Sequence, residues 1–437
     1  MSKIALIGAG SLQFGLSSVG GILNSEILKG ATIYLHDINE EALKLTHEAC
    51  ESAINKKNLE FNLESSVIRK EALKDAMFII NSIEVTPRFK LFDMDYRVPL
   101  EFGNKQITGE NAGPGGLFHS LRTIPPILDI CEDIIKYASP NALLINYSNP
   151  LSRICLAIKR KYPSLKVVGL CHEFQHFMPI LAKILGKSTN SYSIKAGGLN
   201  HFGVILEIKH KDTGQDAYPA IHKNGPNLLR SIEEGPFLDS GYDLIAFILE
   251  TYGYLPYTTD GHYGEYMRWA WEIADIPGTH KFIRDYEQHL HNQNERLKRL
   301  IRRGKGDKIV KSDGERASSI IEGIIADTNY EEASVNIPND DIITNLPKDL
   351  VIECPAIINK SGIHGVKLGE YPKGLAALLR TQASVQDLVV EAILTKSKDI
   401  ALQALLADPV VETYWQAKRI LEEMLKLQEK YLQIQLE

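Results

Sequence analysis

The sequence predicts an α/β fold in which a parallel sheet is built first and a mixed α/β region follows. Over the first 195 residues, short apolar runs bounded by turn residues alternate with helical stretches, which is typical of parallel strands joined by helical crossovers. Beyond that point, strand-like pieces mix with longer helical stretches. We therefore expect two domains, residues 1–195 and residues 196–437, packed together without a long linker.

Each predicted element follows from the positions of its apolar residues. In the first domain, short apolar runs predict buried strands at residues 3–7, 31–37, 78–81, 142–146 and 166–170. Helical spacing predicts helices at about residues 12–29, 40–56 and 128–135. In the second domain, the same criteria predict strands at residues 204–208 and 351–354, helices at residues 282–301 and 385–406, and a terminal amphipathic helix.

Composition and charge narrow the classes of protein. The 437 residues exceed what one hydrophobic core usually serves. The net charge of −6, with no long run of one sign, argues against nucleic acid or an anionic membrane as the main partner. No apolar run approaches a membrane span, the N-terminus lacks a signal-peptide core, and the five cysteines are odd in number and widely spaced. We therefore expect a cytoplasmic protein that binds neither nucleic acid nor a membrane.

A glycine-rich turn follows the first predicted strand. Gly8 and Gly10 come directly after the strand, Ser11 opens the next helix, and Gly15 lies further along it. In such a unit the first glycine permits the tight turn, and the second lets the backbone approach a pyrophosphate at the helix N-terminus. Gln13 stands where the third glycine of GxGxxG belongs. The context predicts a dinucleotide site, with an ordinary structural turn as the alternative.

An acidic residue ends the second predicted strand. Asp37 lies 22 residues beyond Gly15, where a carboxylate hydrogen-bonds the ribose hydroxyls and selects against a 2′-phosphate. The sequence therefore favours NAD over NADP. Ser82, after the strand at residues 78–81, should pass near the cofactor, because ligands bind beyond the carboxyl ends of such strands. An ordinary polar loop is the alternative there.

Two further polar segments follow along the chain. Residues 108–116, which include Glu110, are too glycine-rich for an ordinary loop and would wrap closely around a ligand. Residues 146–150 place Asn146 and Asn149 after a buried strand. Their amides would read hydroxyl groups, unless the segment only forms a turn before the next helix.

A thiol, an imidazole and a carboxylate follow the strand at residues 166–170. They belong to Cys171, His172 and Glu173, and His201 lies 30 residues beyond Cys171. Cysteine and histidine suit a borderline divalent metal that keeps open positions for a substrate. From the residues alone, Cys171 and His201 fit either a metal pair or a buried thiol beside a satisfied histidine.

Taken in order, these segments resemble glycoside hydrolase family 4, the NAD- and divalent-metal-dependent glycosidases. The resemblance extends along nearly the whole chain, through residues 3–11, 109–121, 146–150, 169–173, 198–201, 335–339 and 370–374. It implies a Rossmann-like, doubly wound parallel sheet similar to that of lactate and malate dehydrogenases, with a mixed α/β second domain. It also implies NAD, a divalent metal with Mn²⁺ as the expected ion, a sugar substrate, and a homodimer or homotetramer.

The implied reaction explains why one site needs both a nicotinamide and a metal. NAD⁺ would take a hydride from C3 of the sugar, and the resulting ketone would acidify the C2 proton. A base would remove that proton while the metal, bridging O2 and O3, stabilises the enediolate. The leaving group would depart from C1 by elimination, water would add, and the hydride would return. The family is an exception to the two-carboxylate scheme of other glycosidases.

The resemblance also implies roles for individual residues. Cys171 and His201 would hold the metal, and Asn149 would contact the sugar hydroxyls. Glu110 matches a carboxylate that supports the active-site base. His172 occupies the position that some members use as the acid, and it either donates the proton or only helps to hold metal and substrate.

The base is expected within residues 259–266, which resemble the segment that supplies it in the family. Members acting on phospho-glycosides use a tyrosine, and some members acting on unphosphorylated sugars have an aspartate. We expect Asp260 to be the base, with Tyr263 as the second candidate and a structural loop as the third reading.

The residues after Cys171 indicate the substrate class. The triplet of Cys171, His172 and Glu173 resembles members that act on unphosphorylated α-glycosides, such as α-glucosidases and α-galacturonidases. We therefore expect hydrolysis of an unphosphorylated α-glycoside or α-uronide. One alternative is an NAD-dependent 2-hydroxy acid dehydrogenase of the lactate/malate type, which would accumulate NADH without a metal. The other is a non-catalytic NAD-binding regulator, which would have no reason to keep the cysteine–histidine pair in a polar pocket.

Overall fold

The strands form one continuous sheet. The computed structural model describes residues 2–11, 14–232, 241–312 and 314–437. The strand order is β3-β2-β1-β4-β5-β6-β10-β11-β7-β8-β9, with β12 paired to β11. The first six strands on this path are mutually parallel: β3 (Asn62–Ser66), β2 (Thr32–His36), β1 (Lys3–Ile7), β4 (Phe78–Asn81), β5 (Leu143–Asn146) and β6 (Lys166–Gly169). This order is that of a doubly wound dinucleotide-binding sheet, so the predicted fold class is confirmed.

The remainder of the sheet is antiparallel. Its strands are β10 (Tyr330–Pro338), β11 (Val351–Asn359), β12 (Gly362–Gly365), β7 (Tyr192–Leu199), β8 (Phe202–His210) and β9 (Leu255–Pro256). β10 joins the parallel part through a bridge between Asn336 and Gly169. Residues 195 and 196 lie within β7, a strand of this shared sheet, and the division into two domains stays a prediction.

Helices cover both faces of the parallel strands. Ile4 and Leu6 of β1 pack into one buried cluster, and Ala5 and Ile7 pack into another, because successive residues of a strand point to opposite faces. The first layer contains α1 (Gly15–Leu23), α2 (Glu40–Lys57) and α12 (Ala317–Ala326). The second layer contains α3 (Arg69–Leu73), α5 (Gly113–Tyr137) and α6 (Leu151–Lys161).

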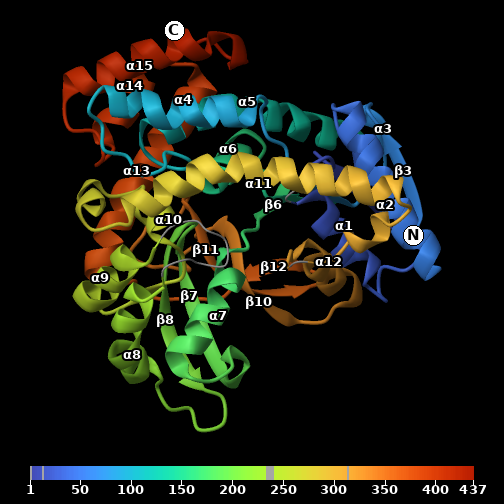
Figure 1. Cartoon of the computed structure of the whole chain (residues 1–437), viewed down its shortest axis with the longest axis horizontal. Coiled ribbons are helices and arrows are strands. Elements are labelled where there is room, and N and C mark those ends of the chain that lie inside the picture. Colours follow the sequence, from blue (N-terminus) through green and yellow to red (C-terminus); the bar gives the residue numbers. More distant parts are fainter. Residues whose placement is uncertain (1, 12–13, 233–240, 313) are drawn as a thin grey trace.

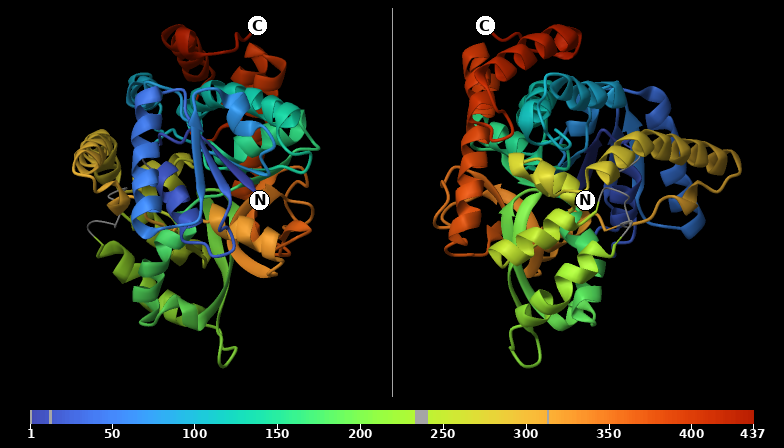
Figure 2. Two further views of the ribbon diagram at one scale, coloured as in Figure 1. Left: turned by 90° about the vertical axis from the view of Figure 1, so that its right-hand side faces the viewer. Right: turned by 60° about the vertical axis from the view of Figure 1, so that its left-hand side comes forward.

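The other helices gather at the two ends of the molecule (Figures 1 and 2). Beside α5 and α6 lie α4 (Arg88–Glu101), α13 (Lys373–Thr395), α14 (Lys398–Ala407) and α15 (Tyr414–Gln428). Around β7 and β8 lie α7 (Glu173–Leu185), α8 (Tyr218–Arg230), α9 (Asp243–Tyr252) and α10 (Asp260–Gly264). The long helix α11 (Ile276–Arg302) crosses from α10 to α2. Short 3₁₀ turns are η1 (Thr189–Ser191), η2 (Arg268–Glu272), η3 (Gly306–Lys308) and η4 (Glu429–Tyr431).

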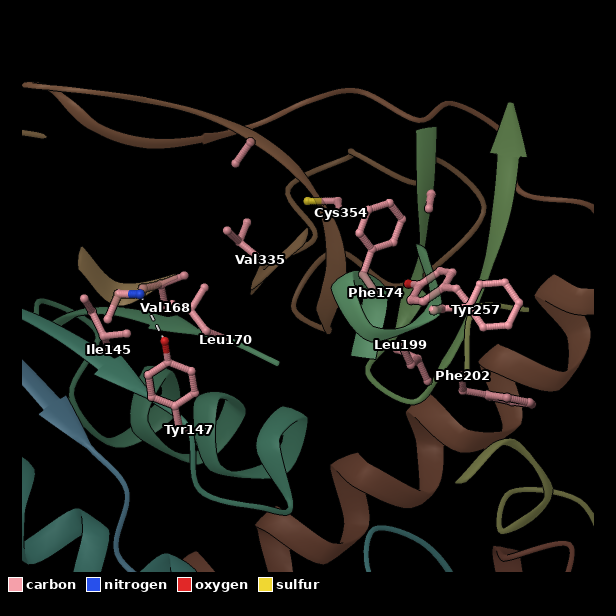
Figure 3. Close-up of a cluster of buried hydrophobic side chains, with 14 of the residues drawn as sticks. Ile145, Tyr147, Val168, Leu170, Phe174, Leu199, Phe202, Tyr257, Val335 and Cys354 are labelled. Atoms are coloured by element: carbon pink, nitrogen blue, oxygen red, sulfur yellow. Dashed lines mark hydrogen bonds between the residues drawn. The ribbon is translucent and has the colours of Figure 1, made fainter. Parts of the chain in front are cut away.

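One apolar cluster joins the parallel and antiparallel parts. Val168 and Leu170, at the end of β6, lie in the same cluster as Val335 of β10 and Cys354 of β11 (Figure 3). Phe174, in the first turn of α7, packs edge-on against an aromatic ring beyond β9, with the centroids 5.4 Å apart. The segment that follows β6 is therefore anchored on both sides by buried contacts.

The structure departs from the sequence predictions at several elements. The edge strand β3 and the helices α3 and α4 are not predicted; β3 has no buried residue, so it lacks the apolar pattern of a strand. The helix predicted at residues 385–406 is two helices, separated at Lys396, which has a φ of 58°, and Ser397, whose side chain caps α14. The helix predicted at residues 128–135 is the end of α5, which already begins at Gly113. The helix predicted at residues 12–29 is the shorter α1, and residues 12–13 lie outside the described part.

Within the described ranges, no helix combines the length and the apolar character that crossing a bilayer requires. All five cysteines are free thiols. The cytoplasmic location and the homodimer or homotetramer stay predictions of the sequence.

Candidate active site

A cavity of about 500 Å³ opens at the carboxyl ends of the parallel strands. Four strands each send the segment that follows them into its wall: Ser11 follows β1, Ser82 follows β4, Asn149 follows β5 and Cys171 follows β6. The connections of the sheet reverse direction between β1 and β4, and ligands of doubly wound sheets bind at this point. Helices α4, α5, α7, α10 and α11 also contribute side chains to the wall.

The turn after β1 leaves no room for side chains. Gly8 has a φ of 81°, in the left-handed region, and a Cβ there would lie 2.9 Å from the backbone of Ser82. The Ser82 hydroxyl donates to the Gly8 carbonyl at 3.2 Å. A Cβ on Gly15 would lie 2.2 Å from the carbonyl oxygen of Ala9, so Gly15 allows α1 to pack closely against the turn. Gln13, at the third position of the motif, lies outside the described residues.

Asp37 follows β2 beside this turn. One of its carboxylate oxygens accepts a hydrogen bond from the Gly10 N–H at 2.9 Å, and the other accepts one from the Asn39 N–H at 2.8 Å. A Cβ on Gly10 would lie 2.9 Å from the same carboxylate. The half-buried carboxylate thus lies against the glycine turn, and its role as a ribose acceptor stays a prediction.

Two segments that lie 30 residues apart in the sequence meet at another part of the cavity wall. Cys171 Sγ lies 3.5 Å from His201 Nε2, and Glu173 Oε2 lies 3.9 Å from the same nitrogen. Ligand atoms of these three residues all lie within 4.8 Å of one another, and Glu110, His201 and His262 form a second such group. A thiol, an imidazole and carboxylates in this arrangement suit a divalent transition metal.

Glu173 has incomplete hydrogen bonding in this cluster. Its Oε1 accepts hydrogen bonds from the Thr258 hydroxyl and from His262 Nδ1, whereas the buried Oε2 accepts none. A buried carboxylate oxygen without a partner is unfavourable, and a bound cation would satisfy it. The donor set therefore fits a metal ion, and it adds Glu173 to the two candidate ligands predicted from the sequence, Cys171 and His201. The signal available in the sequence for Glu173 was its position two residues after Cys171.

The surroundings set the charge of these groups. Burial opposes ionisation of Glu173, but the imidazoles of His201 and His262 outweigh it and lower its pKa to about 2. Burial lowers the pKa of His201 to about 4, which favours the neutral imidazole that a metal requires. Burial, together with the neighbouring Glu173, raises the pKa of the Cys171 thiol well above its ordinary value. A nearby metal cation would favour the thiolate.

A buried glutamate, Glu265, holds the loop that orients His201. Its carboxylate accepts hydrogen bonds from the Thr108 hydroxyl and from the N–H groups of Glu110 and Asn111, each at 2.9 Å. The side-chain amide of Asn111 lies 3.2 Å from His201 Nδ1, so Nε2 is the nitrogen that faces the thiol. The sequence assigned no role to Glu265, because its partners lie more than 150 positions away along the chain.

Glu110 and Asn149 lie together in the cavity wall. Asn149 Nδ2 donates to Glu110 Oε1 at 3.2 Å. Burial opposes ionisation of Glu110, but His262 and His201 outweigh it and lower its pKa. Glu110 is therefore a carboxylate next to the cluster, and it fixes the Asn149 amide at the cavity surface.

His172 lies in the wall beside Cys171. Its ring stacks on that of Phe14, with centroids 5.8 Å apart, and lies 4.2 Å from that of His176. Its Nδ1 lies 3.4 Å from the buried Glu315, a partner that the sequence did not reveal. The imidazole thus has a carboxylate behind it, and its role as an acid stays a prediction.

Asp260 and Tyr263 do not line the cavity. The Asp260 carboxylate is buried and accepts hydrogen bonds from the N–H groups of Leu244 and Ile245 at 3.1 Å and of Asp275 at 3.0 Å. Tyr263 is 1% exposed, and its ring packs edge-on against an aromatic ring of β8. This placement corrects the expectation that Asp260, or else Tyr263, faces a sugar as the base.

Two residues of the same segment, Thr259 and His262, do reach the cavity, and His262 is the titratable one. Its ring stacks on that of His201, with centroids 4.3 Å apart. Its Nδ1 is hydrogen-bonded to Glu173, and its Nε2 lies 4.0 Å from Glu110 Oε2. His262 therefore connects the two carboxylates of the cluster.

Comparison with known proteins identifies the family. A model described as family 4 glycosyl hydrolase matches residues 3–187, and the model of the C-terminal domain of that family matches residues 196–411. The chain belongs to family 4 of the glycosyl hydrolases. An alpha-glucosidase from Erwinia rhapontici is 39% identical to this glycosyl hydrolase over 461 aligned positions, which cover 99% of each chain. The resemblance noted in the sequence is thus confirmed, and the chain is an enzyme rather than a non-catalytic regulator.

Two solved structures show the same fold as this glycosyl hydrolase. A 6-phospho-alpha-glucosidase from gut microorganisms, in complex with NAD and Mn²⁺, matches with a TM-score of 0.84 at 21% identity over 100% of both chains. Malate dehydrogenase from Plasmodium falciparum matches with a TM-score of 0.50 at 14% identity, over 90% of this chain and 99% of that one. The sheet of this hydrolase is therefore related in fold to that of a dehydrogenase.

Proposed function

We propose that this enzyme hydrolyses a neutral, unphosphorylated α-glycoside with the help of NAD and a divalent metal, with Mn²⁺ as the expected ion. The observation that carries the proposal is the cluster of Cys171, Glu173 and His201. This cluster shares one cavity with Ser11 of the glycine turn and with Ser82, which follows β4. A dehydrogenase of the lactate/malate type has no need of such a cluster. The α-glucosidase relative and the neighbour that binds NAD and Mn²⁺ support the same assignment.

The charges of the cavity wall favour a neutral sugar. Among the described residues that line the cavity, the only Lys or Arg side chains are Arg88 and Arg122, and the sequence has no Lys or Arg outside the described ranges. Arg122 donates to the buried Asp95 at 2.8 Å, and Arg88 Nε lies 3.9 Å from Glu84. A phosphate or a uronate is usually bound by a free guanidinium or ammonium group. Because both cations already have a carboxylate partner, we favour a hexoside over a uronide or a phospho-sugar.

The residues fit a dinucleotide and a metal. The narrow turn at Gly8 and Gly10 would bring backbone N–H groups against a pyrophosphate, with Ser11 directly after the turn and ahead of α1, which begins at Gly15. Asp37 would accept hydrogen bonds from the adenosine ribose. When bound, NAD⁺ supplies a hydride acceptor for C3 of the sugar, and the metal polarises the neighbouring sugar oxygens.

The chain's own side chains would then bind the sugar and move protons. Asn149, fixed by Glu110, would bind a hydroxyl group beside the cluster. His262 would accept the C2 proton, because Glu173 orients its ring and Glu110 would stabilise the imidazolium that forms. His172 would donate a proton to the departing oxygen.

Hydrolysis without net redox change tests the proposal. We expect cleavage of p-nitrophenyl α-glucoside or α-galactoside with NAD⁺, Mn²⁺ and a thiol reductant, and loss of activity with EDTA. The matching α-uronide and 6-phospho-α-glucoside should be poorer substrates. A preference for either charged substrate would contradict the neutral assignment, and NADH that accumulates in proportion to substrate would indicate a dehydrogenase instead.

A further inference from the structure

Two helices form an aromatic wall along the cavity. Phe89 of α4 and Tyr286 of α11 meet edge to face with centroids 5.8 Å apart, and Phe282 stacks on Tyr286 at 5.0 Å. All three rings are half-buried and line the cavity. Further along, Tyr96 of α4 meets His280 of α11 at 5.5 Å, so the two helices pack together beyond the wall itself.

The wall connects to the proposed catalytic cluster through polar contacts. The guanidinium carbon of Arg88 lies 5.2 Å from the centroid of Tyr286, and Arg88 Nε lies 3.9 Å from Glu84. His119 lies 3.5 Å from Glu84 and 2.9 Å from the backbone carbonyl of Glu110. The aromatic wall is therefore linked to Glu110 through Arg88, Glu84 and His119, and both line the cavity in which we place the sugar.

The other end of α11 lies near the nucleotide turn. Lys298 pairs with Glu41 of α2 at 3.0 Å, four residues after Asp37 in the sequence. The aromatic residues occupy the first half of α11, and Lys298 lies in its last turns. The wall and the proposed adenosine site thus lie at different ends of this helix.

We propose that the aromatic wall of Phe89, Phe282 and Tyr286 is the subsite that binds the leaving group of the glycoside. Its ligand class is a neutral ring that presents a broad apolar face, either the C–H face of a second pyranose or the face of an aryl group. Aromatic faces bury the C–H surface of a sugar or stack with an aryl ring. On the same face of α11, Asp285 and His289 line the cavity and are exposed, so they can bind hydroxyl groups at the edge of that ring. The inference rests on the proposed hydrolase function.

Leaving-group dependence tests this subsite. The variants are Phe89→Ala and Tyr286→Ala, with Gln288→Ala as a control on an exposed part of α11 that does not line the cavity. We expect kcat/KM for the p-nitrophenyl α-glycoside and for the corresponding disaccharide to fall roughly five- to tenfold in each cavity variant. For the methyl α-glycoside of the same sugar, which has almost no leaving group to bind, kcat/KM should change less than about twofold. Gln288→Ala should match the wild type on all three substrates.

Other outcomes would overturn the subsite. An equal loss on the methyl and aryl glycosides would mean that the rings only support the fold or the sugar itself. A raised Kd for NAD⁺ with an unchanged preference among leaving groups would mean that the wall binds the cofactor. If the wild type hydrolyses the glycosides but the variants keep its leaving-group preference, the subsite fails while the proposed function stands. If the wild type hydrolyses none of them, both fail.

Discussion

Two buried carboxylates near the cavity, Glu173 and Asp260, are bonded in opposite ways. Both oxygens of Asp260 accept hydrogen bonds from backbone N–H groups in the first turn of α9 and just before α11. Glu173 is bonded through one oxygen only, and its other oxygen lies 3.9 Å from His201 Nε2 without a hydrogen-bond donor. A buried carboxylate is favourable only when its oxygens are paired. Asp260 is therefore complete as a structural cap, whereas Glu173 would be completed by a bound metal ion.

Asp260 and His262, which both belong to α10, differ in the same way. Asp260 opens the helix and turns toward α9, while His262, two positions later, lines the cavity and contacts Glu173. Residues two apart on a helix do not share a face. Burial alone therefore does not identify a catalytic group, and the partners of its polar atoms must be followed.

The largest expected effect on turnover comes from replacing His262. In His262→Gln the side chain can still hydrogen-bond to Glu173 but cannot accept a proton, so turnover should fall by about 10²–10⁴-fold. Exchange of the sugar C2 hydrogen with D2O should be lost, whereas the Kd values for NAD⁺ and Mn²⁺ should change little. The matched control is Asp260→Asn, in which exchange should persist. Loss of Mn²⁺ binding in His262→Gln would instead make His262 a metal ligand.

The next effect concerns the incomplete cluster. His201→Ala and Glu173→Gln each remove a donor next to Cys171, so Mn²⁺ affinity should fall by at least about 10–100-fold, and turnover at limiting metal should fall with it. Calorimetric titration with Mn²⁺ measures this directly. The Kd for NAD⁺ should stay within about twofold, since the glycine turn is untouched. Wild-type Mn²⁺ affinity in Glu173→Gln would leave the unpartnered oxygen unexplained.

The sequence predicted the strands and the polar residues that follow them. It did not predict contacts between residues that are distant along the chain. The strands and the polar residues that follow them, such as Ser82, Asn149 and Cys171, could be placed because the carboxyl ends of parallel strands meet at one edge. The orientation of Asp260 could not be predicted, because its partners are backbone groups of Leu244 and Asp275, each about 15 positions away. A cap on another helix leaves no periodic signal in the sequence.

A smaller effect, the dependence of Mn²⁺ affinity on pH, is expected from Cys171. Burial and Glu173 raise the pKa of the Cys171 thiol well above its ordinary value, so the thiol is protonated between pH 6 and 8 and must lose its proton to bind metal. The Kd for Mn²⁺ should therefore decrease by up to about tenfold per pH unit over this range. His201, with a pKa lowered to about 4, should not add to the slope. A Kd that does not vary between pH 6 and 8 would exclude Cys171 as a thiolate ligand.

The smallest effect on catalysis is expected at Asp260, whose contribution we assign to stability. Asp260→Ala removes the acceptor for three backbone N–H groups, so the free energy of unfolding should fall by about 1–3 kcal/mol. Turnover per folded molecule should stay within about twofold at a temperature where the variant is folded. Denaturant unfolding, followed alongside turnover, measures both quantities.

The pH dependence of the free energy of unfolding is a second, independent test of the role of Asp260. Burial raises its pKa to about 7, above the value of about 3.9 for an unfolded chain. Folding therefore disfavours the ionised form, so the stability contributed by this group is fully present below about pH 4 and is lost as pH rises through about 7. The side chain of Asp260→Asn does not titrate. The free energy of unfolding of the wild type, relative to that of this variant, should therefore fall between pH 5 and pH 8. A variant that loses turnover and C2 exchange while this difference stays constant would return Asp260 to the role of base, and the contrast with Glu173 would fail.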